Sequence, residues 1–148
     1  MTINIFVAVV ISKSKVYIPT HAITEFGYYE TIPLDIVNAN EEEITLAIDK
    51  AKLRGNPQWP DADARILTKQ KSVVLKSTQY KSQKDMVKQA CSYSIMWTDE
   101  HIVVEMGRSN KKGAWLYQKD LQKKFPLATL TQRISATIMD DAKTQGCI

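Results

Sequence analysis

Two residue types that act together in nucleophilic catalysis, cysteine and histidine, occur close together in the stretch CSYSIMWTDEHIVVEMGR, residues 91–108. Cys91 begins this stretch, and His101 follows directly after the acidic pair Asp99 and Glu100. An imidazole that activates a thiol must lie within hydrogen-bond reach of it, about 3 Å. The secondary structure of the stretch therefore decides whether it can hold a catalytic dyad.

The residue pattern of this stretch predicts a β-hairpin. Residues 91–98 alternate between two faces, residues 101–108 are again rich in strand formers, and Asp99-Glu100 can form the turn. With that turn, Cys91 lies roughly 23 Å along the strand from the rung that holds His101, at about 3.3 Å per residue. Cys91 is then a small core residue. His21, the other histidine, stays open as an alternative partner, because the sequence does not fix its position.

The two cysteines do not form a recognisable metal or redox motif. Cys91 and Cys147 are too far apart in sequence for a CxxC pair or a zinc pattern. We expect two free thiols in a reducing cytoplasm, with Cys147 on a frayed C-terminal tail.

Other catalytic patterns are equally weak. The sequence has no Walker loop and no GxGxxG, so it gives no support for a phosphate-cradling loop. The carboxylate pairs Asp61/Asp63 and Asp140/Asp141 could each hold a magnesium ion, but solvated loop acids are commoner. We therefore expect no metal, no cofactor and no enzymatic activity.

The elements that must position these residues fit one domain, residues 1–148. The apolar run 3–11 is shorter than the roughly 20 residues of a membrane span, so it predicts a buried strand and no membrane partner; a weak signal peptide is the alternative. Strands are expected on both sides of a turn at Glu25–Gly27, with an edge position or a bulge at Pro33. Further strands are expected at 72–76, in the 91–108 hairpin and at 114–118.

Three helices are predicted between these strands. The clearest begins after Asn38 or Asn40, carries three glutamates in its first turn and ends at Gly55. A short helix follows Ser82. The last has Leu130, Ile134, Ile138 and Met139 on one face, with Thr129 or Thr131 as its cap. The predicted fold is α+β: a mainly antiparallel sheet of about six strands, with two longer helices and one short helix packed on one face.

Charge is unevenly distributed along the chain. Residues 1–63 carry nine acidic and five basic residues, whereas residues 64–90 carry one acidic and seven basic. Lysine-rich segments can neutralise phosphates without reading sequence, although arginine, the usual base-reading residue, is much rarer here than lysine. The candidate nucleic-acid contacts are Lys76, Lys81, Lys84, Lys88, Lys111 and Lys112. The alternative is that these lysines only keep the surface solvated.

Aromatic residues gather in two acidic turns. Phe26, Tyr28 and Tyr29 lie between Glu25 and Glu30, and Trp59 lies in a loop with Asp61 and Asp63. Exposed tyrosine and tryptophan side chains often anchor protein interfaces. The alternative is that Tyr28 or Tyr29 points inward and Trp59 closes the end of the core.

Four segments together resemble a known group: YIPTHAITEFGYYETIP, RGNPQWP, VVLK and CSYSIMW, within residues 17–97. They are similar to small bacterial proteins related to the immunity proteins of contact-dependent growth inhibition systems. The resemblance implies a cytoplasmic antitoxin that binds the C-terminal toxin domain of a large exported protein, often a nuclease. It implies no particular binding residues, because immunity proteins differ widely in surface.

The leading hypothesis is therefore a non-enzymatic immunity protein that occludes a toxin domain. Its candidate toxin-binding residues are Glu25, Tyr28, Tyr29, Glu30, Trp59, Asp61 and Asp63. Nuclease inhibitors are commonly acidic, whereas this chain is basic overall, with a pI near 9.0. The hypothesis therefore requires either that the acidic N-terminal half binds the toxin or that the toxin surface is itself acidic. A nucleic-acid-binding protein is the first alternative and a small cysteine-dependent enzyme the second. The sequence does not fix the oligomeric state.

Overall fold

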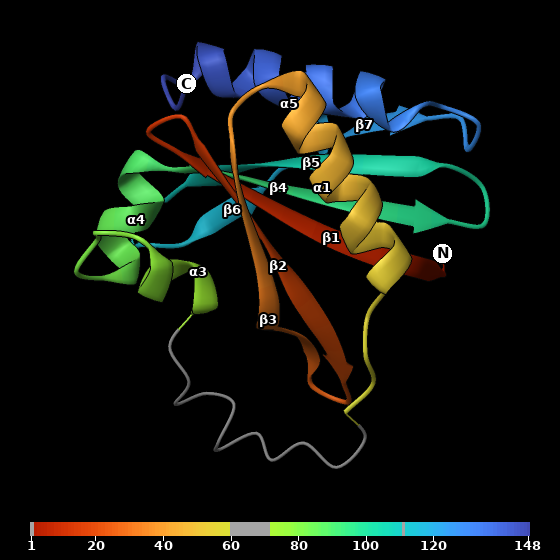
Figure 1. Cartoon of the computed structure of the whole chain (residues 1–148), viewed down its shortest axis with the longest axis horizontal. Helices are drawn as coiled ribbons and strands as arrows, with labels where there is room; N and C mark the ends of the chain where they lie inside the picture. Colours follow the sequence, from red (N-terminus) through yellow and green to blue (C-terminus); the bar gives the residue numbers. More distant parts are fainter. Residues whose placement is uncertain (1, 60–71, 111) are drawn as a thin grey trace.

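The computed structural model describes residues 2–59, 72–110 and 112–148. A seven-stranded sheet forms its centre, with the strand order β3-β2-β1-β4-β5-β6 and with β7 also paired to β5 (Figure 1). All its strand pairs are antiparallel. The strands are β1 (Ile3–Ser12), β2 (Lys15–Thr24), β3 (Gly27–Asn38), β4 (Cys91–Thr98), β5 (Ile102–Ser109), β6 (Trp115–Tyr117) and β7 (Lys123–Phe125).

The predicted α+β class is confirmed. The described helices are α1 (Glu41–Arg54), α3 (Val73–Ser77), α4 (Gln83–Gln89) and α5 (Thr131–Thr144), with a 3₁₀ turn η1 (Lys119–Leu121). The strand beyond the six expected is β7, which forms within a segment predicted to be a plain connection.

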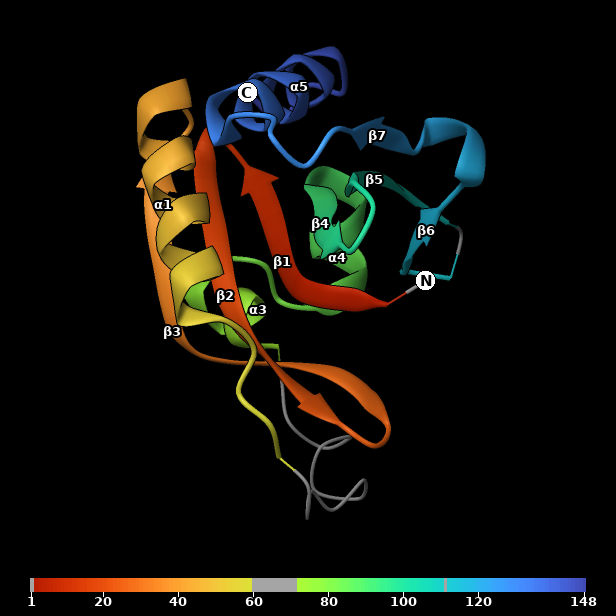
Figure 2. The ribbon, with the colours of Figure 1, turned by 90° about the vertical axis from the view of Figure 1, so that its right-hand side faces the viewer.

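Helices cover both faces of the sheet, so the prediction of one covered face is wrong (Figure 2). Alternation along β1 explains the two faces. Val9 and Ile11 belong to the core under α1 and α5, whereas Val10 belongs to a smaller cluster with Val74 of α3 and Met86 of α4. We call these the α1/α5 face and the α3/α4 face.

The α1 helix forms as its sequence predicts. The Asn40 side chain accepts a hydrogen bond from the Glu43 N–H at 2.9 Å, and Gly55 ends the helix with a φ of 70°. The buried stripe faces the sheet and consists of Ile44, Ala47, Ile48 and Ala51.

The β4–β5 hairpin has the predicted register. Trp97 pairs with Ile102 and Tyr93 with Met106, and the Thr98 N–H donates to the His101 carbonyl at 3.0 Å across the turn. The alternating pattern of the sequence was sufficient to predict this register, because only one register places the large apolar residues of both strands on the α1/α5 face.

Residues 72–76 form the start of a short helix, not the predicted strand. The Ser72 hydroxyl caps α3 by accepting a hydrogen bond from the Leu75 N–H at 3.2 Å, and Val74 is fully buried against the α3/α4 face. A β-branched pair favours a strand only weakly, and here the cap and the burial of one valine decide the conformation.

The last helix begins at Thr131, and its N-cap is Leu130 without a side-chain cap, so neither predicted threonine caps it. The Thr131 hydroxyl instead donates to Asp49 Oδ1 of α1 at 2.6 Å. Leu130 is 73% exposed and does not belong to the apolar face of α5, which begins at Ile134.

Strand β2 is one continuous element from Lys15 to Thr24. Its hairpin with β3 turns at the predicted place, with Thr24 paired to Gly27. Pro33 lies in the predicted bulge: Leu34 pairs with Pro19 and Thr31 with Thr20, so that two residues of the edge strand β3 have no partner between them.

Strands β1 and β2 pair only near their shared turn and then diverge. The amide of Asn56 fills part of the gap: its Nδ2 donates to the carbonyls of Phe6 at 2.8 Å and His21 at 3.0 Å, and its Oδ1 accepts from the Phe6 N–H at 2.9 Å. The segment RGNPQW thus acts as a structural insert between two strands.

Candidate functional site

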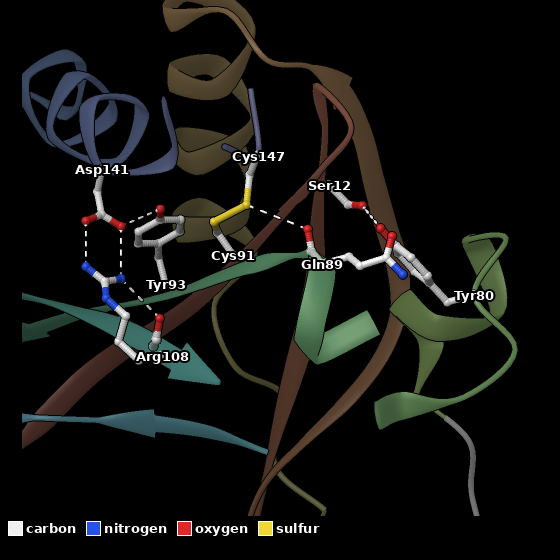
Figure 3. Close-up of a disulfide and its surroundings, with 9 residues drawn as sticks. Ser12, Tyr80, Gln89, Cys91, Tyr93, Arg108, Asp141 and Cys147 are labelled. Atoms are coloured by element: carbon white, nitrogen blue, oxygen red, sulfur yellow. Dashed lines mark hydrogen bonds and ion pairs between the residues drawn. A yellow bond between two sulfur atoms is a disulfide. The ribbon is translucent and has the colours of Figure 1, made fainter. Parts of the chain in front are cut away.

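Cys91 and Cys147 form a disulfide, which corrects the expectation of two free thiols (Figure 3). The chain reverses at Gly146, with a φ of 81°, and returns Cys147 to the start of β4 with a Cα–Cα distance of 6.3 Å. Both cysteines are 5% exposed. The tail is also held by its backbone, because the Ser14 N–H donates to the Cys147 carbonyl at 3.0 Å. It is therefore not frayed.

This bond removes the Cys–His site. Cys91 is covalently occupied, and His101 lies at the far end of the hairpin, next to the turn. His21 is equally remote: its ring contacts Phe6, which pairs with Met96, whereas Cys91 pairs with Ile11. Five residues of strand between these two pairs amount to roughly 16 Å.

A buried polar group joins α5 to the hairpin on the α1/α5 face. Asp141 Oδ2 accepts hydrogen bonds from the Tyr93 hydroxyl at 2.7 Å and from Arg108 Nη1 at 3.1 Å, and Oδ1 accepts from Arg108 Nη2 at 2.8 Å (Figure 3). Burial and the Asp141 carboxylate raise the pKa of Tyr93 far above its ordinary value. Tyr93 therefore keeps its proton, and the group is suited to structure rather than to proton transfer.

Of the two acidic pairs, only Asp140/Asp141 lies within the described residues. Asp141 is already bonded to Arg108, while its neighbour Asp140 is exposed. Within the described residues, no group of three or more histidine, cysteine, aspartate or glutamate side chains could hold a metal ion. Asp61 and Asp63 lie outside the described residues.

The predicted aromatic surface is divided between the two faces of the sheet. Tyr28 stacks on Phe6 with ring centroids 4.4 Å apart, and Phe6 also contacts His21 at 5.1 Å. Tyr29 follows Tyr28 in the strand and points to the opposite face. The β2–β3 turn itself is exposed to solvent: Glu25 is exposed, and Phe26 is 52% exposed.

The remaining candidate residues lie along the same hairpin. Glu30 accepts a hydrogen bond from the Ser72 hydroxyl and so holds the start of α3. Trp59 is half-buried. Its backbone N–H donates to the Ile23 carbonyl at 2.9 Å, and this bond places Trp59 beside the end of β2, near the β2–β3 turn. The structure therefore places the Trp59 backbone beside Ile23, at the end of β2 that leads into the turn, and commits Tyr28 and Glu30 to internal contacts.

Burial sets the protonation of His21. It is 8% exposed and its Nδ1 has no hydrogen-bond partner, and burial lowers its pKa to about 4. His21 is neutral at physiological pH and belongs to the aromatic cluster with Phe6 and Tyr28.

Most of the candidate lysines lie on the side of α3 and α4. The exposed ones are Lys76, Lys81, Lys84, Lys88 and Lys112, while Lys111 is outside the described residues. Gly113 approaches α4 so closely that an added Cβ would lie 3.0 Å from the Lys84 side chain, which brings the β5–β6 turn to this basic surface.

Sequence reasoning overlooked two further lysines, Lys13 and Lys15, in the β1–β2 turn. Lys13 Nζ lies 5.4 Å from the centroid of the Tyr80 ring. The short segment SKSK between two predicted strands could have indicated these lysines. A tight turn in this segment brings both lysines close to any neighbouring segment that packs against the turn.

Comparisons with known proteins show similarity in fold. No protein-family model and no curated protein matches the sequence. One chain of the CdiA-CT/CdiI toxin and immunity complex from Yersinia pseudotuberculosis superposes with a TM-score of 0.70 at 12% identity, over 89% of this chain and 91% of that chain. A protein of unknown function from Neisseria meningitidis superposes with a TM-score of 0.67 at 15% identity, over 92% and 94%.

No helix within the described residues is both long enough and apolar enough to cross a bilayer.

Proposed function

We propose that this chain is an immunity protein that binds and occludes a cognate toxin domain by protein–protein contact. The observation that carries the proposal is the fold similarity, over about nine-tenths of both chains, to a chain of a toxin–immunity complex. The disulfide occupies Cys91, the candidate nucleophile of the alternative cysteine-dependent enzyme. On this proposal the protein meets the toxin in the bacterial cytoplasm, where the Cys91–Cys147 disulfide is an exception to the reduced state of most cytosolic cysteines.

The proposed contact surface is the tip of the β2–β3 hairpin with the adjoining Trp59. Phe26 and the half-buried Trp59 offer aromatic surface, and Glu25, which precedes Phe26 in the turn, is exposed. An aromatic anchor with a neighbouring acid suits a partner whose own site is basic, as a phosphate-cleaving site must be. Tyr29, Asp61 and Asp63 stay within this proposal as flanking residues.

The separation of charge in the fold supports this orientation. The lysines of α3 and α4 are exposed on the helices that cover the α3/α4 face, whereas Glu25 is exposed at the turn of the β2–β3 hairpin. An acidic tip on a basic protein can steer a basic partner to one end of the molecule and disfavour the other.

The experiment begins with capture of partners by the tagged protein from its own bacterium, with and without nuclease treatment. A polypeptide retained in equal amount after nuclease treatment is then cloned and expressed alone. We expect it to arrest growth, and we expect co-expression of this chain to restore growth. Retention of nucleic acid alone, lost as salt rises, would contradict the proposal.

A matched pair of variants tests the surface. Glu25→Lys with Phe26→Ala is expected to weaken toxin binding by about 100-fold or more, because an anchor and a complementary charge are lost together. The control, Glu100→Lys with Leu127→Ala, makes the same kinds of change at exposed sites elsewhere. Equal loss of protection by both variants would show that the hairpin tip is not the contact.

A further inference from the structure

A pocket of about 250 Å³ lies between the β1–β2 turn and the connection from α3 to α4. It has no part in the toxin contact proposed above. Its lining is rich in hydrogen-bond donors and contains two lysines and no acidic residue: Ser12, Lys13, Lys15, Tyr17, Ser77, Thr78, Gln79 and Tyr80.

Tyr17 supplies a donor that is fixed in place. Its side chain lies in the buried cluster of the α3/α4 face and the residue is 9% exposed, yet its hydroxyl has no hydrogen-bond partner among the described residues. Burial, and to a smaller extent Tyr80, raise the pKa of Tyr17. The hydroxyl therefore keeps its proton at neutral pH and can donate it into the pocket.

Ser12 and Tyr80 supply a second donor. Their hydroxyl oxygens are 2.5 Å apart, and either one can be the donor (Figure 3). One bond between two hydroxyls uses one of their two protons, so one proton is left for a ligand. Because Ser12 is 4% exposed, this pair is held rigidly at the end of β1.

The two lysines are positioned by an unusual turn. Lys13 and Ser14 both have positive φ angles, 52° and 62°, as the two central residues of the β1–β2 turn. Ser14 fixes the turn twice, since its N–H donates to Cys147 and its carbonyl accepts from the Ala39 N–H, both at 3.0 Å. Lys15 Nζ donates to Asn38 Oδ1 at 2.7 Å and keeps two further N–H donors.

We propose that this pocket binds a phosphate group. A phosphate presents three or four oxygen acceptors in a tetrahedral arrangement, and the pocket lining supplies two lysines and two hydroxyl donors. The exposed Lys76 and Lys81, on either side of the lining segment 77–80, extend the positive charge beyond the pocket. The phosphate can belong to a small phosphorylated molecule or to the backbone of a single-stranded nucleic acid.

The test uses two probes, inorganic pyrophosphate and a fluorescent single-stranded oligonucleotide of about twelve nucleotides. Pyrophosphate binding is followed by amide chemical shifts in NMR, and oligonucleotide binding by anisotropy. We expect pyrophosphate to shift the amides of residues 12–17 and 77–80 in the intact, oxidised protein. Binding of pyrophosphate alone would assign a small phosphorylated ligand, and binding of both probes would assign a phosphodiester.

Three variants separate a built site from diffuse charge. Lys13→Gln with Lys15→Gln is expected to weaken pyrophosphate binding by about tenfold or more, and Tyr17→Phe by about fivefold. Lys84→Gln with Lys88→Gln removes the same charge from α4, outside the lining, and is expected to change affinity less than about twofold. Thermal unfolding confirms that each variant is folded.

Two results would overturn the proposal. The first is an absence of pyrophosphate-induced shifts at residues 12–17 and 77–80. The second is an equal loss of affinity in the two double-lysine variants, which would show that binding follows overall charge. Neither result bears on the toxin contact at the hairpin tip, so the two proposals fail independently.

Discussion

The two faces of the sheet are built differently. The α1/α5 face carries two helices of 14 residues each, a continuous buried cluster, the Cys91–Cys147 disulfide and the Asp141 ion pair. The α3/α4 face carries helices of 5 and 7 residues over a small cluster around Val10 and Met86. Its covering is short, and it leaves space for the pocket beside Tyr17.

This difference separates stability from recognition. A large apolar cluster with crossing bonds fixes the α1/α5 face, so we expect it to open only when the whole protein unfolds. The α3/α4 face has the smaller buried cluster, so we expect a smaller loss of stability when it rearranges to accept a ligand. The surfaces proposed for binding, the β2–β3 tip and the Tyr17 pocket, both lie outside the α1/α5 core.

The largest effect is expected from truncation in the α1/α5 core. Ile138→Ala removes a fully buried side chain between α5 and the sheet and should lower the free energy of unfolding by about 4 kcal/mol. Met86→Ala on the α3/α4 face should cost about 2 kcal/mol, because a thin cover can collapse into the cavity. Urea unfolding of both variants measures the difference, and a larger cost for Met86→Ala would reverse the comparison.

The disulfide is expected to contribute about 3 kcal/mol, since it closes a long loop between β4 and the tail. Cys147→Ser should lower the unfolding free energy by that amount. A thiol reductant should lower the stability of the wild type and leave the variant unchanged. If the wild type is equally stable with and without reductant, although mass spectrometry shows the bond reduced, the disulfide does not support the α1/α5 face.

His21 gives the opposite side of the sheet a pH dependence. Its pKa in the folded protein is about 4, below the ordinary value of 6.5, so between these values the unfolded chain binds a proton that the folded chain does not. Stability is therefore complete above about pH 6.5 and falls as the pH drops toward 4, by about 2–3 kcal/mol. His21→Leu should remove this part of the pH dependence in urea unfolding followed from pH 4 to 7. Parallel profiles for the two proteins would show that His21 is protonated equally in both states.

The smallest effect is expected from the buried hydroxyl of Tyr93. Tyr93→Phe removes one of three hydrogen bonds to Asp141, while both bonds from Arg108 remain. We expect a loss of about 1 kcal/mol in unfolding free energy. Thr137→Val, at a hydroxyl on α5 that bonds only to a carbonyl of its own helix, is the control and should change stability less. A loss several times larger in Tyr93→Phe would show that the three side chains act as one cooperative unit.

Particular residues show how far sequence reasoning reached. Asn40 and Gly55 predicted both ends of α1, and the alternation in residues 91–98 predicted the hairpin register. The prediction from sequence failed at Ser72, whose side chain caps a helix in a segment predicted to be a strand. It also failed at Thr131, whose hydroxyl donates to Asp49 of α1 instead of capping α5. In both cases a side-chain partner or a burial site distant in sequence overrode the local preference.

The candidate surfaces followed the same division. The turn at Glu25–Gly27 and its exposed aromatic residue could be read from the sequence, because turn chemistry is local. The stacking of Tyr28 on Phe6 and the hydrogen bond between Ser72 and Glu30 could not be predicted from the sequence, because these contacts join separate strands and a helix.

By itself, the sequence determined the α+β class, the first helix, the hairpins and the polarity of the charge distribution, all of which depend on spacing within about a dozen residues. Tertiary structure alone decided that Cys147 meets Cys91, that helices cover both faces, and that Lys13, Lys15, Tyr17 and Tyr80 line one pocket. The disulfide joins residues 56 positions apart, and the pocket brings residues 12–17 against residues 77–80. Chain closure over such distances is set by how the whole sheet packs, and no local pattern records it.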